Sequence, residues 1–241
     1  MSNIAFNEDS FKKIESDGTS MTVEWSIQKS AFLILLTIWS AIATWMIPEI
    51  NTFVLPIYIP FIIGTFILAL IIIFAKKTAP FLSPVYAILE WVILAAISML
   101  YEAMLPWIVM QSVWLTFAIF LTMLGLYASK IIVVTQKFRM WVVAATWAIA
   151  LVYLISLVWS LTGWFTVPYI HESGIIGIWI SVFIVGIAAF NLALDFDNIE
   201  MWAKANAPKY MEWYSAFWLL VTLIWLYLEV LRLLGKIRSS D

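Results

Sequence analysis

The residues best placed for chemistry are four acids in or beside long apolar segments: Glu90, Asp195, Asp197 and Glu212. An ionisable side chain at the centre of a bilayer costs about 2.5 kcal/mol or more, so each acid is a functional candidate. Carboxylate oxygens are the ligands that hard cations such as Ca²⁺ prefer. These residue types therefore indicate cation binding or proton exchange.

Glu90 lies about eight residues into its apolar segment, which is roughly 12 Å along a helix and near the middle of a membrane. Ser83, Ala87, Leu94 and Ser98 share its helical face, so this face is small and partly polar. One interpretation gives Glu90 a role in an ion pathway. The other is a protonated carboxyl that hydrogen-bonds across a helix interface.

A polar stripe marks the apolar segment before the last one. Asn191, Asp195 and Asn198 follow one another at helical spacing, whereas Asp197 points elsewhere. Asp195 and Glu212 lie on either side of a short connection, so both should reach similar depths near one membrane surface. If the two carboxyls meet, they could share a proton and respond to pH as a unit. Alternatively, each acid caps a helix end independently.

Composition and patterning define the elements that hold these acids. Apolar residues make up 64% of the 241 residues and charged residues 12%, against roughly half and a quarter in a soluble domain. Uncharged apolar runs of about 20 residues recur, the length that a hydrocarbon core requires. The sequence therefore predicts an all-α membrane protein with seven transmembrane helices. The expected spans are residues 30–47, 53–75, 82–104, 107–127, 139–162, 174–199 and 210–234.

The spans define a simple domain organisation. Residues 1–29 are expected to be a polar cytoplasmic segment, because they lack the apolar core of a signal peptide. Residues 30–234 form one transmembrane domain, and residues 235–241 form a short tail.

The distribution of Lys and Arg predicts the orientation. With the N-terminus inside, the inner segments hold most of the 13 basic residues and the loops between spans on the outer side hold none. Arg232, Lys236 and Arg238 near the C-terminus are the exceptions. We expect the C-terminus outside, unless the last span is re-entrant.

Several function classes are excluded. The absence of cysteine rules out disulfides, iron–sulfur clusters and thiolate metal sites. The single histidine, His171, cannot form a metal site alone, and there is no HExxH motif, so neither a metal centre nor an enzyme is expected. A net charge of −2 without a basic, aromatic-interleaved patch argues against a nucleic-acid partner.

Other charged residues have simpler interpretations. Glu49, Glu102 and Glu172 lie at outer ends of spans, where they are solvated loop acids or an acidic vestibule for cations. Glu229 and Arg232, three residues apart, are predicted to form an ion pair within one helix.

Three segments resemble the bacterial branch of the Bax inhibitor-1 superfamily. They are residues 77–90 (KTAPFLSPVYAILE), 189–200 (AFNLALDFDNIE) and 208–234 (PKYMEWYSAFWLLVTLIWLYLEVLRLL), and the resemblance runs from about residue 21 to the tail. It implies six helices packed around a central seventh, and a pH-sensitive calcium leak. It also implies a bacterial cytoplasmic membrane.

The resemblance also assigns residues. The family's first acid matches Asp195 within residues 194–196, and its second acid matches Glu212 within residues 210–213, although it is Glu here instead of Asp. The second span lacks the Arg that pairs with the first acid in some members. The expected pH gate and ion pathway comprise Asp195, Glu212, Glu90, Asn191 and Asp197.

Two functions follow as hypotheses. The first is a passive, pH-sensitive cation leak without a cofactor, with Ca²⁺ as the permeant ion. The second is a regulatory protein that binds another membrane protein, such as a quality-control protease. Cation flux through the purified protein distinguishes them.

Overall fold

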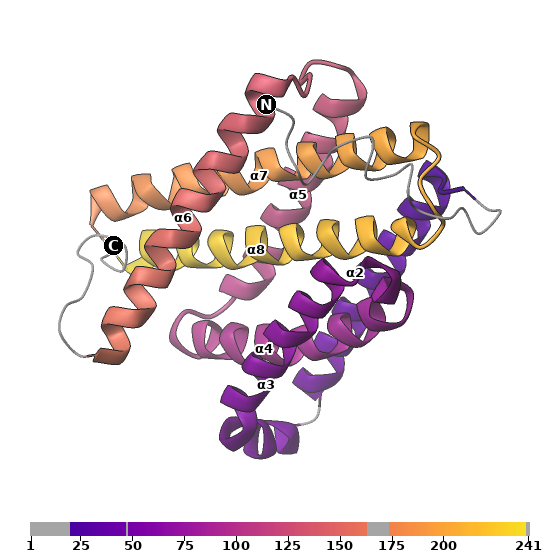
Figure 1. The fold of residues 1–241 in the computed structure, drawn as a ribbon. Helices are drawn as coiled ribbons and strands as arrows, with labels where there is room; N and C mark the ends of the chain where they lie inside the picture. Colours follow the sequence, from indigo (N-terminus) through magenta and orange to yellow (C-terminus); the bar gives the residue numbers. More distant parts are fainter. Residues whose placement is uncertain (1–19, 47, 163–173, 240–241) are drawn as a thin grey trace. The chain divides into compact units, whose positions relative to one another are not determined.

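The computed structural model describes residues 20–46, 48–162 and 174–239 (Figure 1). This part of the chain consists of seven long α-helices and one short 3-10 turn, with a single isolated β-bridge and no longer strand. The helices are α2 (Val23–Met46), α3 (Pro48–Phe74), α4 (Ala79–Met104), α5 (Ile108–Ala128), α6 (Gln136–Thr162), α7 (Ile175–Lys204) and α8 (Met211–Ser239), and the 3-10 turn is η1 (Lys76–Thr78).

The predicted all-α membrane fold is confirmed. Each of the seven expected spans falls on one of the helices α2 to α8. Over the described residues, six of these helices are long and apolar enough to cross a membrane, and α3 contributes a shorter apolar stretch, Pro60–Phe74.

Two helices extend beyond the expected spans. The first helix begins at Val23, ahead of residue 30. Serine hydroxyl groups in this extension hydrogen-bond to backbone carbonyls one turn earlier in the chain. The Ser26 hydroxyl donates to the Thr22 carbonyl at 2.7 Å, and the Ser30 hydroxyl donates to the Ser26 carbonyl at 2.8 Å. The last helix continues past residue 234 to Ser239, with basic residues in its final turn, where they interact favourably with the helix dipole.

The chain divides into two compact units. Unit 1 comprises the described residues within 1–96 and 197–220, and unit 2 comprises those within 97–196 and 221–241. Helices α4, α7 and α8 each contribute residues to both units.

Unit 1 is held together by aromatic contacts around the start of α8. The rings of Tyr86 and Phe217 pack edge to face at 5.0 Å between centroids. The Lys76 ammonium lies 5.4 Å from the centre of the Tyr214 ring, and the Met21 N–H donates to the Ala207 carbonyl at 2.7 Å. The starts of α2 and α8 and the turn after α3 therefore meet in this unit, as expected of segments on one membrane side.

Unit 2 contains two apolar clusters. Ile108 and Val109 pack with Leu231, while Ile149 packs with two isoleucines of α7. The Arg238 guanidinium donates to the Pro106 carbonyl at 2.6 Å. The end of α8 and the turn between α4 and α5 therefore meet in this unit, and the sequence predicts that both lie outside the membrane on the same side.

The last helix is uninterrupted and is the most buried of the six membrane-length helices. Within its most apolar window 61% of the residues are buried, against 11–41% in the other five. Its 29 residues correspond to about 43 Å, more than a bilayer core requires. This continuity argues against a re-entrant last span.

A close helix contact yields a first prediction, at Gly235 of α8. A Cβ atom added there would lie 2.8 Å from Cε1 of Tyr101, whose ring packs against the Ile108 cluster. We expect Gly235→Ala to lower the free energy of unfolding by about 1–3 kcal/mol through overpacking. Thermal unfolding in detergent measures the loss.

Gly186 of α7 provides the matched control, because a Cβ there would meet nothing within 4 Å. Gly186→Ala should leave the unfolding midpoint unchanged or raise it slightly, since Ala favours a helix over Gly by up to about 1 kcal/mol. Equal midpoints for the two variants would contradict the predicted contact.

Candidate functional site

Asp195 is a buried acid on the α7 face that packs within unit 2. Its side chain is 9% exposed. The Thr222 hydroxyl of α8 hydrogen-bonds to its carboxyl, and the positive charge of Arg139 in the first turn of α6 acts on it. Its Oδ2 atom has no hydrogen-bond partner among the described residues. A buried carboxyl with an unfilled oxygen is suited to taking up a proton, a water molecule or a cation.

Asn191 lies one turn before Asp195, on the same face of α7. Its side-chain amide donates to the Thr146 hydroxyl of α6 at 2.8 Å and to the Ile187 carbonyl at 2.9 Å. The amide therefore joins α6 to α7 one turn away from the acid.

Glu212, at the start of α8, has its partners in unit 1. It is fully buried, and its Oε1 accepts from the Thr22 N–H at 3.0 Å. Its Oε2 forms an ion pair with Lys29 of α2, and the Lys29 ammonium also lies 5.3 Å from the centre of the Trp213 ring. These contacts occupy both carboxylate oxygens and attach α2 to α8. The proton shared with Asp195 stays a prediction, because the two acids belong to different units.

The other two predicted acids, Glu90 and Asp197, each interact with a side chain of their own helix. Glu90 is half-buried and hydrogen-bonds to Tyr86, one turn earlier on α4. The bond therefore lies within one helix instead of crossing a helix interface. Asp197 is half-buried in unit 1, where its charge acts on Lys204 at the end of α7.

A comparison of the sequence with protein-family models decides the family. The model described as "Bax inhibitor 1 like" matches residues 3–239, nearly the whole chain. The chain belongs to this family. No curated protein and no solved structure matches it. Membership in the Bax inhibitor 1 like family agrees with the resemblance found in the sequence, while the bacterial branch stays a prediction.

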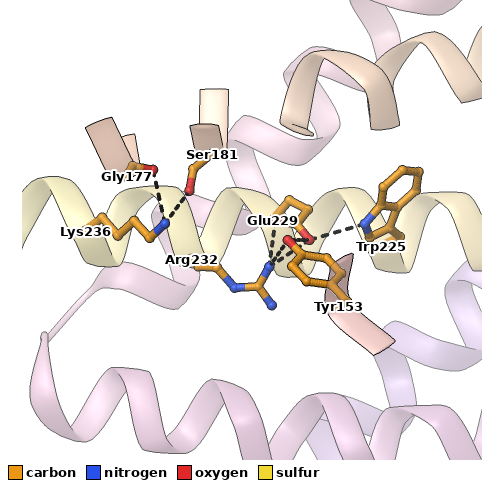
Figure 2. Close-up of polar contacts among 7 residues, drawn as sticks. All are labelled: Tyr153, Gly177, Ser181, Trp225, Glu229, Arg232 and Lys236. Carbon is orange, nitrogen blue, oxygen red and sulfur yellow. Dashed lines mark hydrogen bonds and ion pairs between the residues drawn. The ribbon is translucent and has the colours of Figure 1, made fainter. Parts of the chain in front are cut away.

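This family member contains a second buried charge cluster, in unit 2. Glu229 is 1% exposed, and Arg232 binds its Oε2 at 2.8 Å, which confirms the predicted ion pair. The Tyr153 hydroxyl of α6 and the Trp225 indole N–H donate to Glu229 Oε1 at 2.9 and 3.2 Å (Figure 2). The Tyr153 oxygen in turn accepts from Arg232 at 2.5 Å. The carboxylate is thus fully satisfied by donors from two helices.

Lys236 lies one turn beyond Arg232 and is 6% exposed. Its ammonium group donates to the Gly177 carbonyl at 3.1 Å and to the Ser181 hydroxyl at 2.9 Å, both on α7 (Figure 2). In the sequence this lysine is only one of the three basic residues that are exceptions to the predicted orientation, and its burial could not be predicted.

Of the three acids predicted at the outer ends of spans, Glu102 is the one whose side chain the structure describes. Glu102 is half-buried instead of solvated, and its carboxylate accepts from the backbone N–H groups of Trp107 and Val109 at 2.6 and 3.0 Å. It therefore caps the start of α5, where a helix has free N–H groups. Glu172 and His171 lie outside the described residues, as does the side chain of Glu49.

Proposed function

We propose that the chain is a passive, pH-sensitive cation leak, with Ca²⁺ as the main permeant ion. The observation that carries this proposal is the buried Asp195 carboxyl, whose Oδ2 has no hydrogen-bond partner among the described residues. Membership in the Bax inhibitor 1 like family supports it. Buried acids within transmembrane helices typically mark ion or proton pathways.

In this proposal, protons and Ca²⁺ compete for the Asp195 carboxyl. A carboxylate oxygen binds Ca²⁺ when it is ionised and loses that affinity when it is protonated. Burial of the Asp195 carboxyl disfavours the ionised form, whereas the Thr222 hydroxyl and the positive charge of Arg139 stabilise it. Proton binding at Asp195 would therefore change the charge that a passing cation meets, and flux would depend on pH.

The other predicted residues have separate proposed roles. Glu90 provides a second carboxyl in the pathway, next to Tyr86. Asn191 positions α6 against α7 beside Asp195, and Asp197 adds negative charge near the same end of α7. The pairing of Glu212 with Asp195 stays a sequence-based prediction, and the contacts of Glu212 with Thr22 and Lys29 support a role in attaching α2 to α8.

Flux through the purified protein tests the proposal. Liposomes containing the protein and a calcium-sensitive dye should load Ca²⁺ without an energy source, at a rate that changes between acidic and mildly alkaline buffer. Protein-free liposomes provide the control. An absence of flux across this range would contradict the leak and favour the alternative, a protein that binds another membrane protein.

The proposed location is a bacterial cytoplasmic membrane, with the N-terminus and the loop before α6 inside. Because the natural chain lacks cysteine, a single cysteine can report the side of any position. Lys137→Cys should resist a membrane-impermeant thiol reagent in intact cells and react after the membrane is opened. Arg238→Cys should react in intact cells. The reverse pattern would overturn the orientation.

A further inference from the structure

The turn between α4 and α5 contains a tryptophan where its backbone favours glycine. Within residues 105–108 (LPWI) the Ile108 N–H donates to the Leu105 carbonyl at 3.3 Å, and Trp107 has φ 70° and ψ 3°. These are features of a type II turn, in which proline is common at the second position and glycine or asparagine occupies the third. A bulky side chain at positive φ strains the backbone. The indole of Trp107 is therefore present at a cost that some other interaction must offset.

Contacts from α4 and α8 hold the turn in this strained conformation. The Glu102 carboxylate accepts from the Trp107 N–H at 2.6 Å and from the Val109 N–H at 3.0 Å. The Arg238 guanidinium donates to the Pro106 carbonyl at 2.6 Å. Strained backbone persists only where the surrounding structure over-determines it. The fold of unit 2, and not the local preference of the chain, thus sets the direction of the Trp107 side chain.

The described part of the protein does not offset the strain at Trp107. The residue is 70% exposed. Its ring makes no aromatic contact and its indole N–H makes no hydrogen bond among the described residues. The partner of this side chain therefore lies outside the described part of the chain.

The surroundings of Trp107 identify its partner as the lipid–water interface. Helix α5 follows directly and has 21 residues, which rise about 30 Å, the thickness of a hydrocarbon core. Trp107 thus lies at one end of a membrane-length helix, the level at which an apolar ring with one N–H donor is favoured. The exposed residues three positions before and after it are Met104 and Met110, at 71% and 51%. Both are apolar, which suits contact with acyl chains and not with water.

We propose that Trp107 docks the turn between α4 and α5 onto the lipid interface. Its ring lies among the acyl-chain segments nearest the headgroups, and its N–H donates to lipid ester or phosphate oxygens. Glu102 and Arg238 are positioning residues, because they hold the backbone that directs the ring. The bilayer thereby fixes the depth at which α5 begins and, through Arg238, the depth of the end of α8. This inference does not depend on the proposed leak.

The order of glycine and alanine variants tests the strain. Both substitutions remove the indole, and they differ only by a Cβ atom. In one detergent, Trp107→Gly should unfold about 2–4 °C above Trp107→Ala, because glycine alone adopts positive φ without strain. Trp114 is the matched control: it is also 70% exposed but lies within α5. There the order should reverse, since alanine favours a helix over glycine. The same order at both positions would overturn the inference.

Depth-dependent quenching tests the partner. Trp107→Cys introduces the only thiol of the chain, which can carry a bimane fluorophore in phospholipid nanodiscs. Nitroxide-labelled lipids should quench it most strongly when the nitroxide lies near the headgroups. The same fluorophore on Trp114→Cys, about 10 Å further along α5, should be quenched most strongly by a nitroxide deeper in the acyl chains.

Two results of this experiment would contradict lipid docking. Quenching of the Trp107→Cys label by aqueous iodide, but not by lipid nitroxides, would place the turn in water. Protection from both kinds of quencher would show that a protein surface covers it, either a second copy of the chain or another partner. If Trp107→Cys fails to fold, Met104→Cys at the end of α4 carries the fluorophore instead.

Thermal unfolding in nanodiscs measures what the anchor contributes. Trp107→Gly should unfold about 2–4 °C below the wild type in the bilayer, even though it relieves the strained backbone. Trp107→Tyr keeps an aromatic ring with a polar end and should stay closer to the wild type. A Trp107→Gly variant at least as stable as the wild type in nanodiscs would show that the bilayer does not offset the strain, and the proposal would fail.

Discussion

Asp195→Asn should abolish most of the pH dependence of cation flux. The substitution keeps the size and the hydrogen-bonding capacity of the side chain, so the Thr222 contact can persist, but Asn cannot exchange a proton. The ratio of fluxes between mildly alkaline and acidic buffer should fall to about one, if Asp195 is the group that titrates. Stopped-flow measurement of Ca²⁺ entry into liposomes at several pH values tests this expectation.

Glu212→Gln reveals whether the two acids share a proton. A shared proton predicts that Glu212→Gln also flattens the pH profile, and that the double variant resembles each single variant. The contacts of Glu212 with Thr22 and Lys29 favour a different result. On these contacts we expect Glu212→Gln to lower the thermal stability by loosening α2 from α8, while leaving the pH dependence in place.

A control variant makes this comparison specific. Lys29→Met removes the partner of Glu212 without altering either acid. It should lower stability as Glu212→Gln does, if attachment of α2 is the role of Glu212. A pH profile that stays intact in Asp195→Asn would instead remove Asp195 from the gate and leave Glu90 as the remaining candidate.

The parts of the structure that the sequence predicted correctly depend on local signals. The length of each apolar run set the number of helices, and a spacing of three residues placed Arg232 beside Glu229 on one helix face. Both signals act within a few turns, where helical periodicity determines which side chains are neighbours. The cap formed by Glu102 was missed although its signal is local: an acid a few residues before the start of a helix.

The parts that could not be predicted depend on contacts between distant segments. Lys29 and Glu212 are separated by 183 positions, and Tyr153 and Glu229 by 76. Helix periodicity shows which face of α8 is polar, but not which neighbouring helix covers it. The donors around Glu229 and the oxygens around Lys236 therefore emerged only from the packing of α6 and α7 against α8 in unit 2.

The Glu229 cluster should be the most sensitive point for stability. Arg232→Met leaves a carboxylate that is 1% exposed with only neutral donors from Tyr153 and Trp225. Removing one partner of a buried ion pair typically costs about 3–5 kcal/mol. We expect a large fall in the thermal unfolding midpoint in detergent, measured by circular dichroism.

The cause of that fall can be isolated with two further variants. The double variant Glu229→Leu, Arg232→Met removes both charges and should regain much of the lost stability, because an apolar pair of similar volume replaces a buried ion pair at little cost. The exposed pair between Glu200 and Lys204 is the matched control at the same kind of helical spacing, and Lys204→Met should change stability by less than about 1 kcal/mol. If Arg232→Met is as stable as Lys204→Met, the Glu229 carboxylate does not depend on its ion pair. A double variant less stable than Arg232→Met would show instead that the cluster acts through the shape of its side chains and not through an unpaired charge.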